Sequence, residues 1–510
     1  MANQADDTAA PGLLPNLVER RARHQRDGTY LVAARSNRTV TFFELAAHVG
    51  HWHHRLGDLD IEPGARVGLL IADPVAFATT FVSLLANGVW VAPLDPALVD
   101  LHGRALDDRL VKLRLRAIVS DRERPLDARL DWIGLGVTMH DAGGPAPAPE
   151  SFSDDGGVVL ASSGTTGVPK VILLPTRQLL HAAHLIAQHN ELDASSIGFN
   201  PLPLWHINAE VVAVLASLVA GSAIVLDDRF HRTEFWTTIE RVGATWINAV
   251  PAIIAHLSTL REGEAVPTRV RFVRSASAPL AASVLARFQA ATGLTVIETY
   301  GMTEAASQIC ANPLAGPHKV GSVGRPVGVE LRIRPSDTGA ETAIGEVEIR
   351  GPSVIERYES ADLSDRFEQG GWLRTGDMGY FDDDGYLFLA GRRDDMINRG
   401  GEKIFPREIE EVVLAVSGVA NAAVIARNDE IFGQVPVLYI QLHDVAPFER
   451  AIETAMLDGV RAAVVANFDR ARRPVEIVIV ERMPTHATGK IQKKALTAEH
   501  VIVLSRRAFA

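Results

Sequence analysis

Short apolar runs of strand length alternate with helical patterns through the first 300 residues, and this alternation limits the possible folds. The apolar run 66–72 (RVGLLIA) precedes a helical pattern over 74–88. A helical pattern over 209–221 precedes the apolar run 222–226, and a further strand-like run spans 269–277. Apolar strands separated by helices form parallel sheets that are covered on both faces. The sequence therefore predicts an α/β fold rich in parallel sheet.

The pattern changes after residue 320. Residues 345–351 (GEVEIRG) alternate in polarity, which predicts a half-buried antiparallel strand. An amphipathic helix is predicted over 406–418 and a strand over 420–429. The charged segment 391–395 (GRRDD) precedes the predicted helix over 406–418 and the strand over 420–429. We place a domain boundary there, giving a large domain over 1–393 and a small one over 394–510.

Composition excludes several classes of protein. The net charge of −11 disfavours nonspecific binding to nucleic acid or to an anionic membrane. The single cysteine excludes an internal disulfide and a multi-cysteine metal site. The N-terminus lacks the pattern of a signal peptide, and the longest apolar run, 211–220, is far shorter than the ~20 residues that span a bilayer. We expect a cytoplasmic protein, monomeric or homodimeric.

The stretch 161–175 (ASSGTTGVPKVILLP) concentrates glycine, hydroxyl side chains and one lysine after the apolar run 157–161. Small residues let backbone amides approach an anion closely, and hydroxyl and lysine groups add donors for phosphate oxygens. The spacing differs from that of P-loop nucleotide-binding proteins. An ordinary Ser/Thr/Gly loop between strands would have the same composition, so the loop alone leaves both interpretations open.

Further motifs follow in order along the chain. Residues 298–304 (ETYGMTE) come directly after the apolar run 294–297, at a strand's carboxyl end, where open α/β sheets bind ligands. Residues 372–380 (WLRTGDMGY) place an aspartate in a turn, and 484–494 (PTHATGKIQKK) place a Gly-Lys pair near the end of the chain. Taken singly, these are compatible with a turn aspartate, a helix-capping glutamate and a solvated lysine.

Taken together, the motifs resemble the adenylate-forming superfamily of acyl-CoA synthetases, adenylation domains and luciferases, from TFFELAAHV (41–49) to GKIQKK (489–494). The resemblance implies a large N-terminal domain of parallel-rich sheets covered by helices, with a β-barrel-like subdomain, and a small mobile α+β C-terminal domain. It implies ATP-dependent activation of a carboxylic acid as an acyl-adenylate, then thioester formation with coenzyme A. ATP, Mg²⁺ and coenzyme A are the implied cofactors.

The resemblance also implies roles for single residues. Lys490 and Thr303 would act at the α-phosphate, Glu304 would hold Mg²⁺, and Tyr300 would lie near the adenine. Asp377 would accept the two ribose hydroxyls, and Arg392 would support the ribose and phosphate. The phosphate-loop residues would contact the β- and γ-phosphates: Ser163, Thr165, Thr166, Gly167 and Lys170. One departure is Val171, where the family usually has glycine.

Three further positions concern the second chemical step. Asp394 matches the hinge between the two domains, and Gly400 and Gly401 match the glycines that line the thiol tunnel. Lys490 and Gly401 then serve different half-reactions at one site. The resemblance therefore predicts that the small domain rotates about Asp394 between the two steps.

The acid pocket is expected from three stretches, 201–210, 246–253 and 273–280, together with the residues around Met302. The sequence is closest there to oxalate-type and other short-acid CoA ligases, and Arg274, His206 and His318 could offer positive charge to a second carboxylate. An ordinary structural role for these basic residues stays open. The expected pocket residues are Trp205, His206, Asn248, Arg274, Ser275, Ala276, Ser277, Gly301 and Met302.

Two other sequence features could carry chemistry, and two other functions could use the same motifs. Four histidines over 48–54 could bind zinc, although no carboxylate or cysteine lies among them and a solvated helix face explains them as well. Cys310 has no neighbour in the sequence that would activate it. The acyl group could pass to a carrier protein or an amine instead of coenzyme A. A nonenzymatic nucleotide sensor is disfavoured by the presence of Lys490, Glu304 and Asp377.

Overall fold

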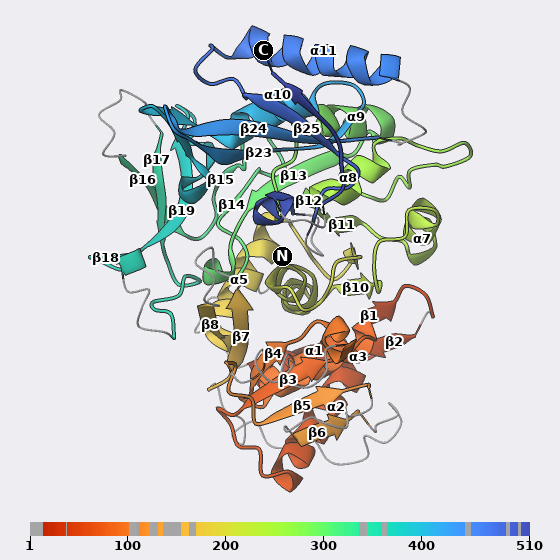
Figure 1. The fold of residues 1–510 in the computed structure, drawn as a ribbon. Coiled ribbons are helices and arrows are strands. Elements are labelled where there is room, and N and C mark those ends of the chain that lie inside the picture. The colour runs from red at the N-terminus through yellow and green to blue at the C-terminus, as the bar shows by residue number, and fades with distance from the viewer. Residues whose placement is uncertain are drawn as a thin grey trace.

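A computed structural model shows a large domain built on three sheets with a smaller domain seated at one end (Figure 1). The structure describes residues 14–36, 38–100, 110, 112–122, 131–135, 155–162, 170–335, 344–359, 365–443, 450–485, 490–497 and 501–509.

A nine-stranded sheet forms the centre of the large domain, in the order β15-β14-β13-β12-β11-β9-β10-β1-β2. Its six central strands are parallel, and the pairs at the two ends are antiparallel. The prediction of parallel sheet is therefore confirmed. The strands are β1 (Thr29–Ala33), β2 (Thr39–Thr41), β9 (Ile197–Asn200), β10 (Ala223–Leu226), β11 (Trp246–Ala249), β12 (Phe272–Ser275), β13 (Thr295–Tyr300), β14 (Cys310–Ala311) and β15 (Arg325–Pro326).

A second sheet has six strands in the order β6-β5-β3-β4-β7-β8, and only its last pair is antiparallel. The expected strand over 66–72 is β3, and the apolar runs on either side of the phosphate-loop motif are β7 and β8. The strands are β3 (Arg66–Leu70), β4 (Trp90–Pro93), β5 (Ala117–Ser120), β6 (Asp131–Gly134), β7 (Gly157–Ser162) and β8 (Lys170–Pro175).

Helices separate the strands and share one hydrophobic core with them. The helix α2 begins at a capping box, in which Thr41 and Glu44 satisfy each other's backbone N–H groups. The expected helix over 209–221 is a π-helical segment followed by α6. The helices are α1 (Leu14–His24), α2 (Phe42–Asp58), α3 (Pro74–Ala86), α5 (Thr176–His189), the π-helical η3 (Ala209–Leu215), α6 (Ala216–Ala220), α7 (Phe235–Val242), α8 (Pro251–Leu257) and α9 (Ala282–Thr292), with the 3₁₀ turn η1 (Pro96–Asp100).

An antiparallel sheet completes the large domain, in the position expected for the barrel-like subdomain. The prediction of a half-buried strand at 345–351 is wrong, because five of the six residues of this strand are buried. Arg332 and Arg374 pair with its glutamates Glu348 and Glu346, which allows these charged side chains to be buried. The strands are β16 (Glu330–Pro335), β17 (Gly345–Arg350), β18 (Phe367–Glu368), β19 (Trp372–Phe381) and β20 (Leu387–Arg392).

The small domain has a separate hydrophobic core. Its expected helix over 406–418 ends early, at Leu414, so Val416 lies beyond the helix. The expected strand over 420–429 is β23. The elements are the 3₁₀ turn η6 (Arg393–Asp395), β21 (Ile397–Arg399), β22 (Glu402–Ile404), α10 (Pro406–Leu414), β23 (Val419–Asp429), β24 (Gly433–Leu442), α11 (Arg450–Asn467), β25 (Glu476–Val480), the 3₁₀ turn η7 (Lys493–Thr497) and β26 (Val503–Ala508).

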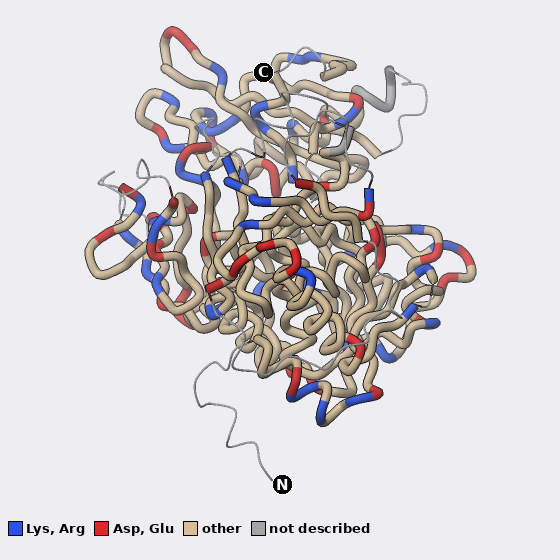
Figure 2. The backbone as a smooth tube through the Cα atoms, turned by 90° about the horizontal axis from the view of Figure 1, so that it is seen from below, with Lys and Arg blue, Asp and Glu red and all other residues tan. Residues whose placement is uncertain are grey.

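In the view of Figure 2, acidic and basic residues are interspersed along the backbone. Among the described helices, none combines the length and apolar character needed to cross a membrane.

Candidate active site

The phosphate-loop motif closes the β-hairpin formed by β7 and β8, in which Ser162 pairs with Lys170. The loop residues Ser163, Thr165, Thr166 and Gly167 lie outside the described residues. Lys170 begins β8 and is 8% exposed. The hairpin therefore holds Lys170 at the end of a buried strand, next to the loop.

Lys170 lies within a group of charged and aromatic side chains. Its ammonium is 5.6 Å from the centre of the Tyr358 ring, and the Tyr358 hydroxyl donates to Oε1 of Glu304 at 2.8 Å. Burial lowers the pKa of Lys170, and the nearby positive charge of Arg366 lowers it further, while Glu304 opposes the shift. The lysine and the carboxylate expected at the phosphates thus lie together, joined through Tyr358.

The motif 298–304 ends in a tight turn. Thr303 begins the 3₁₀ turn η4 (Thr303–Ala305), which carries the buried Glu304. A Cβ atom on Gly301 would lie only 1.4 Å from the backbone oxygen of Ser307, so glycine is required there. Ala306 and Ser307 have positive φ angles of 49° and 95°. Strained backbone of this kind is common at functional sites, where the surrounding structure holds it in place.

Asp377 is held from two sides. The Tyr300 hydroxyl donates to its Oδ2 at 2.5 Å, and Nε of Arg392 pairs with its Oδ1 at 2.7 Å. Burial and then the Asp377 charge raise the pKa of Tyr300, so the phenol stays protonated and acts as a donor. The three residues expected around the nucleoside therefore form one group, contributed by β13, β19 and β20.

Lys490 of the small domain reaches this group. The residue keeps solvent-accessible surface, yet enough protein surrounds its ammonium for burial to lower its pKa, and the charge of Arg392 lowers it further. Asp377 and Asp395 act in the opposite direction. The motifs 298–304, 372–380, 391–410 and 484–494 thus converge in this domain arrangement.

A row of polar side chains crosses the central sheet beside the expected acid pocket. Asn248 on β11 donates through Nδ2 to Asn200 at 2.9 Å and to Asn208 at 2.8 Å. Asn208 belongs to the stretch 201–210, which is expected to form one wall of the pocket. Because Asn248 pairs with Arg274 on β12, the row continues to that arginine.

Arg274 is 1% exposed and makes one hydrogen bond to a neutral partner, from Nη2 to Oε1 of Gln308 at 2.5 Å. Its Nε and Nη1 have no hydrogen-bond partner among the described residues, and neither does the buried hydroxyl of Ser275. Burial lowers the pKa of Arg274 to about 9, so the guanidinium remains charged at pH 7. Its described contacts thus leave a buried cation without a counter-ion.

The other expected pocket residues lie on the same segments. Trp205 and His206 precede η3, with ring centroids 6.3 Å apart, and Met302 packs against the large core. Ala276 is buried, and Ser277 has a positive φ of 72° just after β12. His318 is held by its own loop, since Nε2 lies 2.6 Å from the backbone oxygen of Pro313.

The expected thiol-tunnel glycines form the turn between β21 and β22. Gly400 and Gly401 have positive φ angles of 59° and 100°, and a Cβ atom on Gly401 would meet open space. The Gly400 N–H donates to the backbone oxygen of Phe432 at 2.8 Å, which ties this turn to the neighbouring hairpin. Asp394 lies in η6, directly between the last strand of the large domain and β21.

Two family models match the chain. The AMP-binding enzyme model matches residues 18–359, and the AMP-binding enzyme C-terminal domain model matches residues 408–490. The first match alone covers more than half of the chain. The chain belongs to the AMP-binding enzyme family.

Named relatives of this AMP-binding enzyme are acid–CoA ligases. A sulfoacetate–CoA ligase from Cupriavidus necator is 34% identical, over 95% of this chain and 97% of the relative. An oxalate–CoA ligase from Arabidopsis thaliana is 33% identical, over 88% of this chain and 90% of the relative. The o-succinylbenzoate CoA synthetase of Bacillus subtilis, solved with an acyl-adenylate intermediate, superimposes with a TM-score of 0.80 at 25% identity, over 96% and 99% of the chains.

These comparisons confirm the predicted class of reaction. The protein is an AMP-forming ligase that activates a carboxylic acid through an acyl-adenylate and joins it to coenzyme A. Its cofactors are ATP, Mg²⁺ and coenzyme A. The Glu304 carboxylate fits the metal, because it is buried beside Lys170 and carboxylate oxygens are preferred Mg²⁺ ligands.

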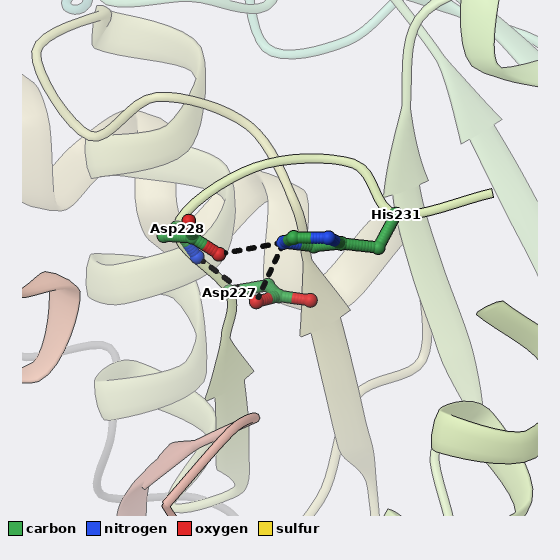
Figure 3. Close-up of side chains that lie close together, drawn as sticks. All are labelled: Asp227, Asp228 and His231. Carbon is green, nitrogen blue, oxygen red and sulfur yellow. Dashed lines mark hydrogen bonds and ion pairs between the residues drawn. The ribbon is translucent and has the colours of Figure 1, made fainter. Parts of the chain in front are cut away.

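Among the described residues of the AMP-binding enzyme, Asp227, Asp228 and His231 form a cluster with the spacing of a metal site, outside this region (Figure 3). His231 Nε2 lies 2.8 Å from Asp228 and 3.9 Å from Asp227. However, Arg35 pairs with both oxygens of Asp227 at 3.0 Å. This ion pair explains the buried aspartate without a metal. Residues 229–234 line a surface pocket that shares no residue with the candidate active site.

The histidines of residues 48–54 and the single cysteine occupy structural positions where the structure describes them. His48 is buried in α2, and His53 Nδ1 lies 2.9 Å from Oδ1 of Asn87. No group of metal-ligating side chains among the described residues includes these histidines. Cys310 is fully buried on β14, and burial raises the pKa of its thiol well above the usual range.

Sequence reasoning missed two residues of the site. Tyr358 bridges Lys170 and Glu304, and Gln308 holds Arg274. Tyr358 lies outside every motif, so no local signal identifies it. Gln308 follows the motif 298–304 by four residues, and its buried position becomes visible only once the chain doubles back at Ala306 and Ser307.

Proposed function

We propose that the acid carries a second anionic group, which Arg274 binds at the floor of the pocket. The supporting observation is the buried guanidinium, which has only a neutral described partner. A buried charge without a counter-ion costs several kcal/mol, and an anionic ligand would offset that cost. Arg274 belongs to the expected pocket stretch 273–280 and adjoins Asn248 of the stretch 246–253.

The acids named for two relatives support a small dianion as the substrate. Sulfoacetate and oxalate, the acids named for two of them, each pair a carboxylate with a second negative group. Arginine suits both kinds of partner, because its fork of N–H donors matches carboxylate and other oxyanion groups. In this proposal one carboxylate reacts and the other anionic group is held by Nε and Nη1 of Arg274.

The other site residues are proposed to act on ATP during acyl-adenylate formation. In the first step a carboxylate oxygen of the acid attacks the α-phosphorus of ATP, the bond to the β-phosphate oxygen breaks, and pyrophosphate leaves. Lys170 would neutralise the departing phosphates, and Lys490 and Thr303 would stabilise the charge that grows at the α-phosphate. Glu304 would hold Mg²⁺, which supplies positive charge to the phosphate chain when bound.

The remaining roles concern binding of the nucleoside and transfer of the acyl group to coenzyme A. Asp377, oriented by Tyr300 and Arg392, would accept the ribose hydroxyls, exchanging its present donors for those of the ligand. In the second step the thiol of coenzyme A releases its proton to water and its sulfur bonds to the acyl carbon. The bond from that carbon to the phosphate oxygen breaks, and AMP leaves. Gly400 and Gly401 would line the path of the thiol after the small domain rotates about Asp394.

Compact acids should outcompete fatty acids in a direct assay. In a mixture, small dianionic acids should be converted in preference to acyl chains of roughly ten or more carbons, which need a long apolar tunnel. Mass spectrometry of the thioesters formed from an equimolar mixture measures the preference. A clear preference for the long chains would overturn the proposed substrate class.

Restricting the hinge should separate the two half-reactions. Asp394→Pro fixes φ near −65°, which the 3₁₀ turn seen here tolerates but a rotated hinge need not. Acyl-AMP formation should be largely retained while thioester formation falls, and Asp394→Ala should retain both steps. Single-turnover assays of pyrophosphate release and of thioester formation measure the two steps. Equal loss of both steps in the proline variant would contradict the hinge assignment.

A further inference from the structure

Tyr358 contacts two residues of the candidate active site, and the proposed mechanism gives it no role. It lies in the segment 351–359, which follows β17, and it is 5% exposed. Its hydroxyl donates to Oε1 of Glu304 at 2.8 Å, and its ring centre lies 5.6 Å from the ammonium of Lys170. Among the described residues, no other group hydrogen-bonds the Glu304 carboxylate. The hydroxyl and the ring of one side chain therefore contact the two residues separately.

Backbone contacts hold this segment against both motifs. The Ile355 N–H donates to the backbone oxygen of Glu304 at 2.8 Å. On the other side of the tyrosine, the Glu359 N–H donates to the backbone oxygen of Val171 on β8 at 3.3 Å. Arg66 of β3 binds both carboxylate oxygens of Glu359, at 2.7 and 3.0 Å. Because the chain is fixed on both sides of the tyrosine, its side chain is positioned before a ligand binds.

The tyrosine keeps two opposite charges in separate positions. Lys170 and Glu304 are close enough to act on each other electrostatically, but no ion pair joins them in the described part of the chain. A direct pair would neutralise the ammonium and the carboxylate that are proposed to bind the phosphates and Mg²⁺. The Tyr358 hydroxyl stabilises the carboxylate as a neutral donor, and the ring face attracts the ammonium without occupying its N–H donors. Both charges thus remain available to a ligand.

We infer that Tyr358 is a positioning residue for acyl-adenylate formation: its hydroxyl orients Glu304 toward Mg²⁺, and its ring holds Lys170 in place for the phosphates. The inference rests on the proposed roles of Glu304 and Lys170 and adds the residue that sets their geometry. Groups that hold a metal ligand in place commonly contribute about 10- to 100-fold to metal affinity. Transfer of the acyl group to coenzyme A takes place after pyrophosphate has left, so that step does not depend on Tyr358.

Tyr358→Phe tests the hydroxyl alone, because it keeps the ring beside Lys170. Binding of ATP is measured by calorimetry without an acid substrate, once with Mg²⁺ in excess and once with a chelator. The variant should bind Mg²⁺–ATP about 10- to 100-fold more weakly than the parent and should keep the parent's affinity for metal-free ATP. Tyr358→Leu removes the ring as well, so metal-free ATP should also bind more weakly.

Two controls separate this role from a structural one. Tyr386 is also a buried tyrosine, and its hydroxyl donates to the backbone oxygen of Pro317 at 2.6 Å, outside the candidate site. Tyr386→Phe therefore removes the same chemical group and should leave both ATP affinities unchanged. Supplied with synthetic acyl-AMP, Tyr358→Phe and Tyr358→Leu should form thioester at nearly the parent rate, whereas a folding defect would lower this rate too.

Glu304→Gln distinguishes failure of the inference from failure of the proposed metal site. If Glu304→Gln weakens Mg²⁺–ATP binding and Tyr358→Phe does not, Glu304 binds the metal without help from Tyr358, and the inference is wrong. If Tyr358→Phe weakens both forms of ATP equally, or lowers thioester formation from acyl-AMP as much, the tyrosine has only a structural role, and the inference is again wrong. If Glu304→Gln leaves Mg²⁺–ATP binding unchanged, the proposed metal site is wrong and the inference falls with it.

Discussion

Lys490→Ala should lower the rate of acyl-AMP formation by about 10²–10³-fold, the loss typical when one donor to a developing negative charge is removed. Lys490 lies beside Arg392 and Asp377 in the arrangement seen here, so it is placed to act on the attack at ATP. The same variant, supplied with synthetic acyl-AMP, should form thioester at nearly the parent rate, because the rotated small domain carries Lys490 away. Failure from acyl-AMP as well would contradict this separation of the two steps.

Gly401→Leu should have the opposite effect: it should retain acyl-AMP formation and lose thioester formation. A side chain in the turn between β21 and β22 should block the path of the thiol without disturbing ATP, so the enzyme should release one equivalent of pyrophosphate and then stall. Positive φ makes any side chain at Gly401 strained, and Gly433 is a matched control because its φ is 75° and its Cβ would also meet open space. Gly433→Leu should turn over, and normal turnover by Gly401→Leu would contradict the tunnel assignment.

Arg274→Met should abolish the preference for a dianionic acid. Removing one partner of a buried charge pair costs about 2–5 kcal/mol, so kcat/KM for the dianion should fall by about 30-fold to 5,000-fold. A singly charged acid of the same length, such as propionate against malonate, should lose only a few-fold. The monoanion is therefore an internal control for folding, and comparing the two acids in both proteins isolates the contribution of the second anionic group.

A second substitution at Arg274 distinguishes binding of the anionic group from a purely structural role. Arg274→Lys keeps a positive charge but loses the planar fork of donors, so it should recover part of the activity toward the dianion. If the methionine variant loses activity equally toward both acids, Arg274 has a structural role and the proposed substrate class is wrong.

Local pattern was enough to predict much of the fold. The apolar run over 66–72 and the helical pattern over 74–88 correspond to β3 and α3, because burial between helices imposes a pattern that neighbouring residues share. The pattern was less reliable at 345–351, where alternation suggested a solvated face. Arginines on β16 and β19 pair with the glutamates there, and partners on other strands are invisible to a local pattern.

In the candidate site too, residues within local motifs were predicted and residues that act through distant contacts were not. The motifs gave Lys170, Tyr300, Glu304, Asp377 and Lys490, and the structure places these residues beside one another. Tyr358 and Gln308 were missed because their importance lies only in contacts across the fold.

The most direct test of the central claim is a product analysis with a panel of small acids, ATP and Mg²⁺, with and without coenzyme A. With coenzyme A and a suitable dianionic acid such as sulfoacetate or oxalate, AMP, pyrophosphate and the thioester should form in equal amounts. Without coenzyme A, pyrophosphate release should stop near one equivalent per enzyme. Formation of ADP and phosphate, or conversion of singly charged acids only, would contradict the account.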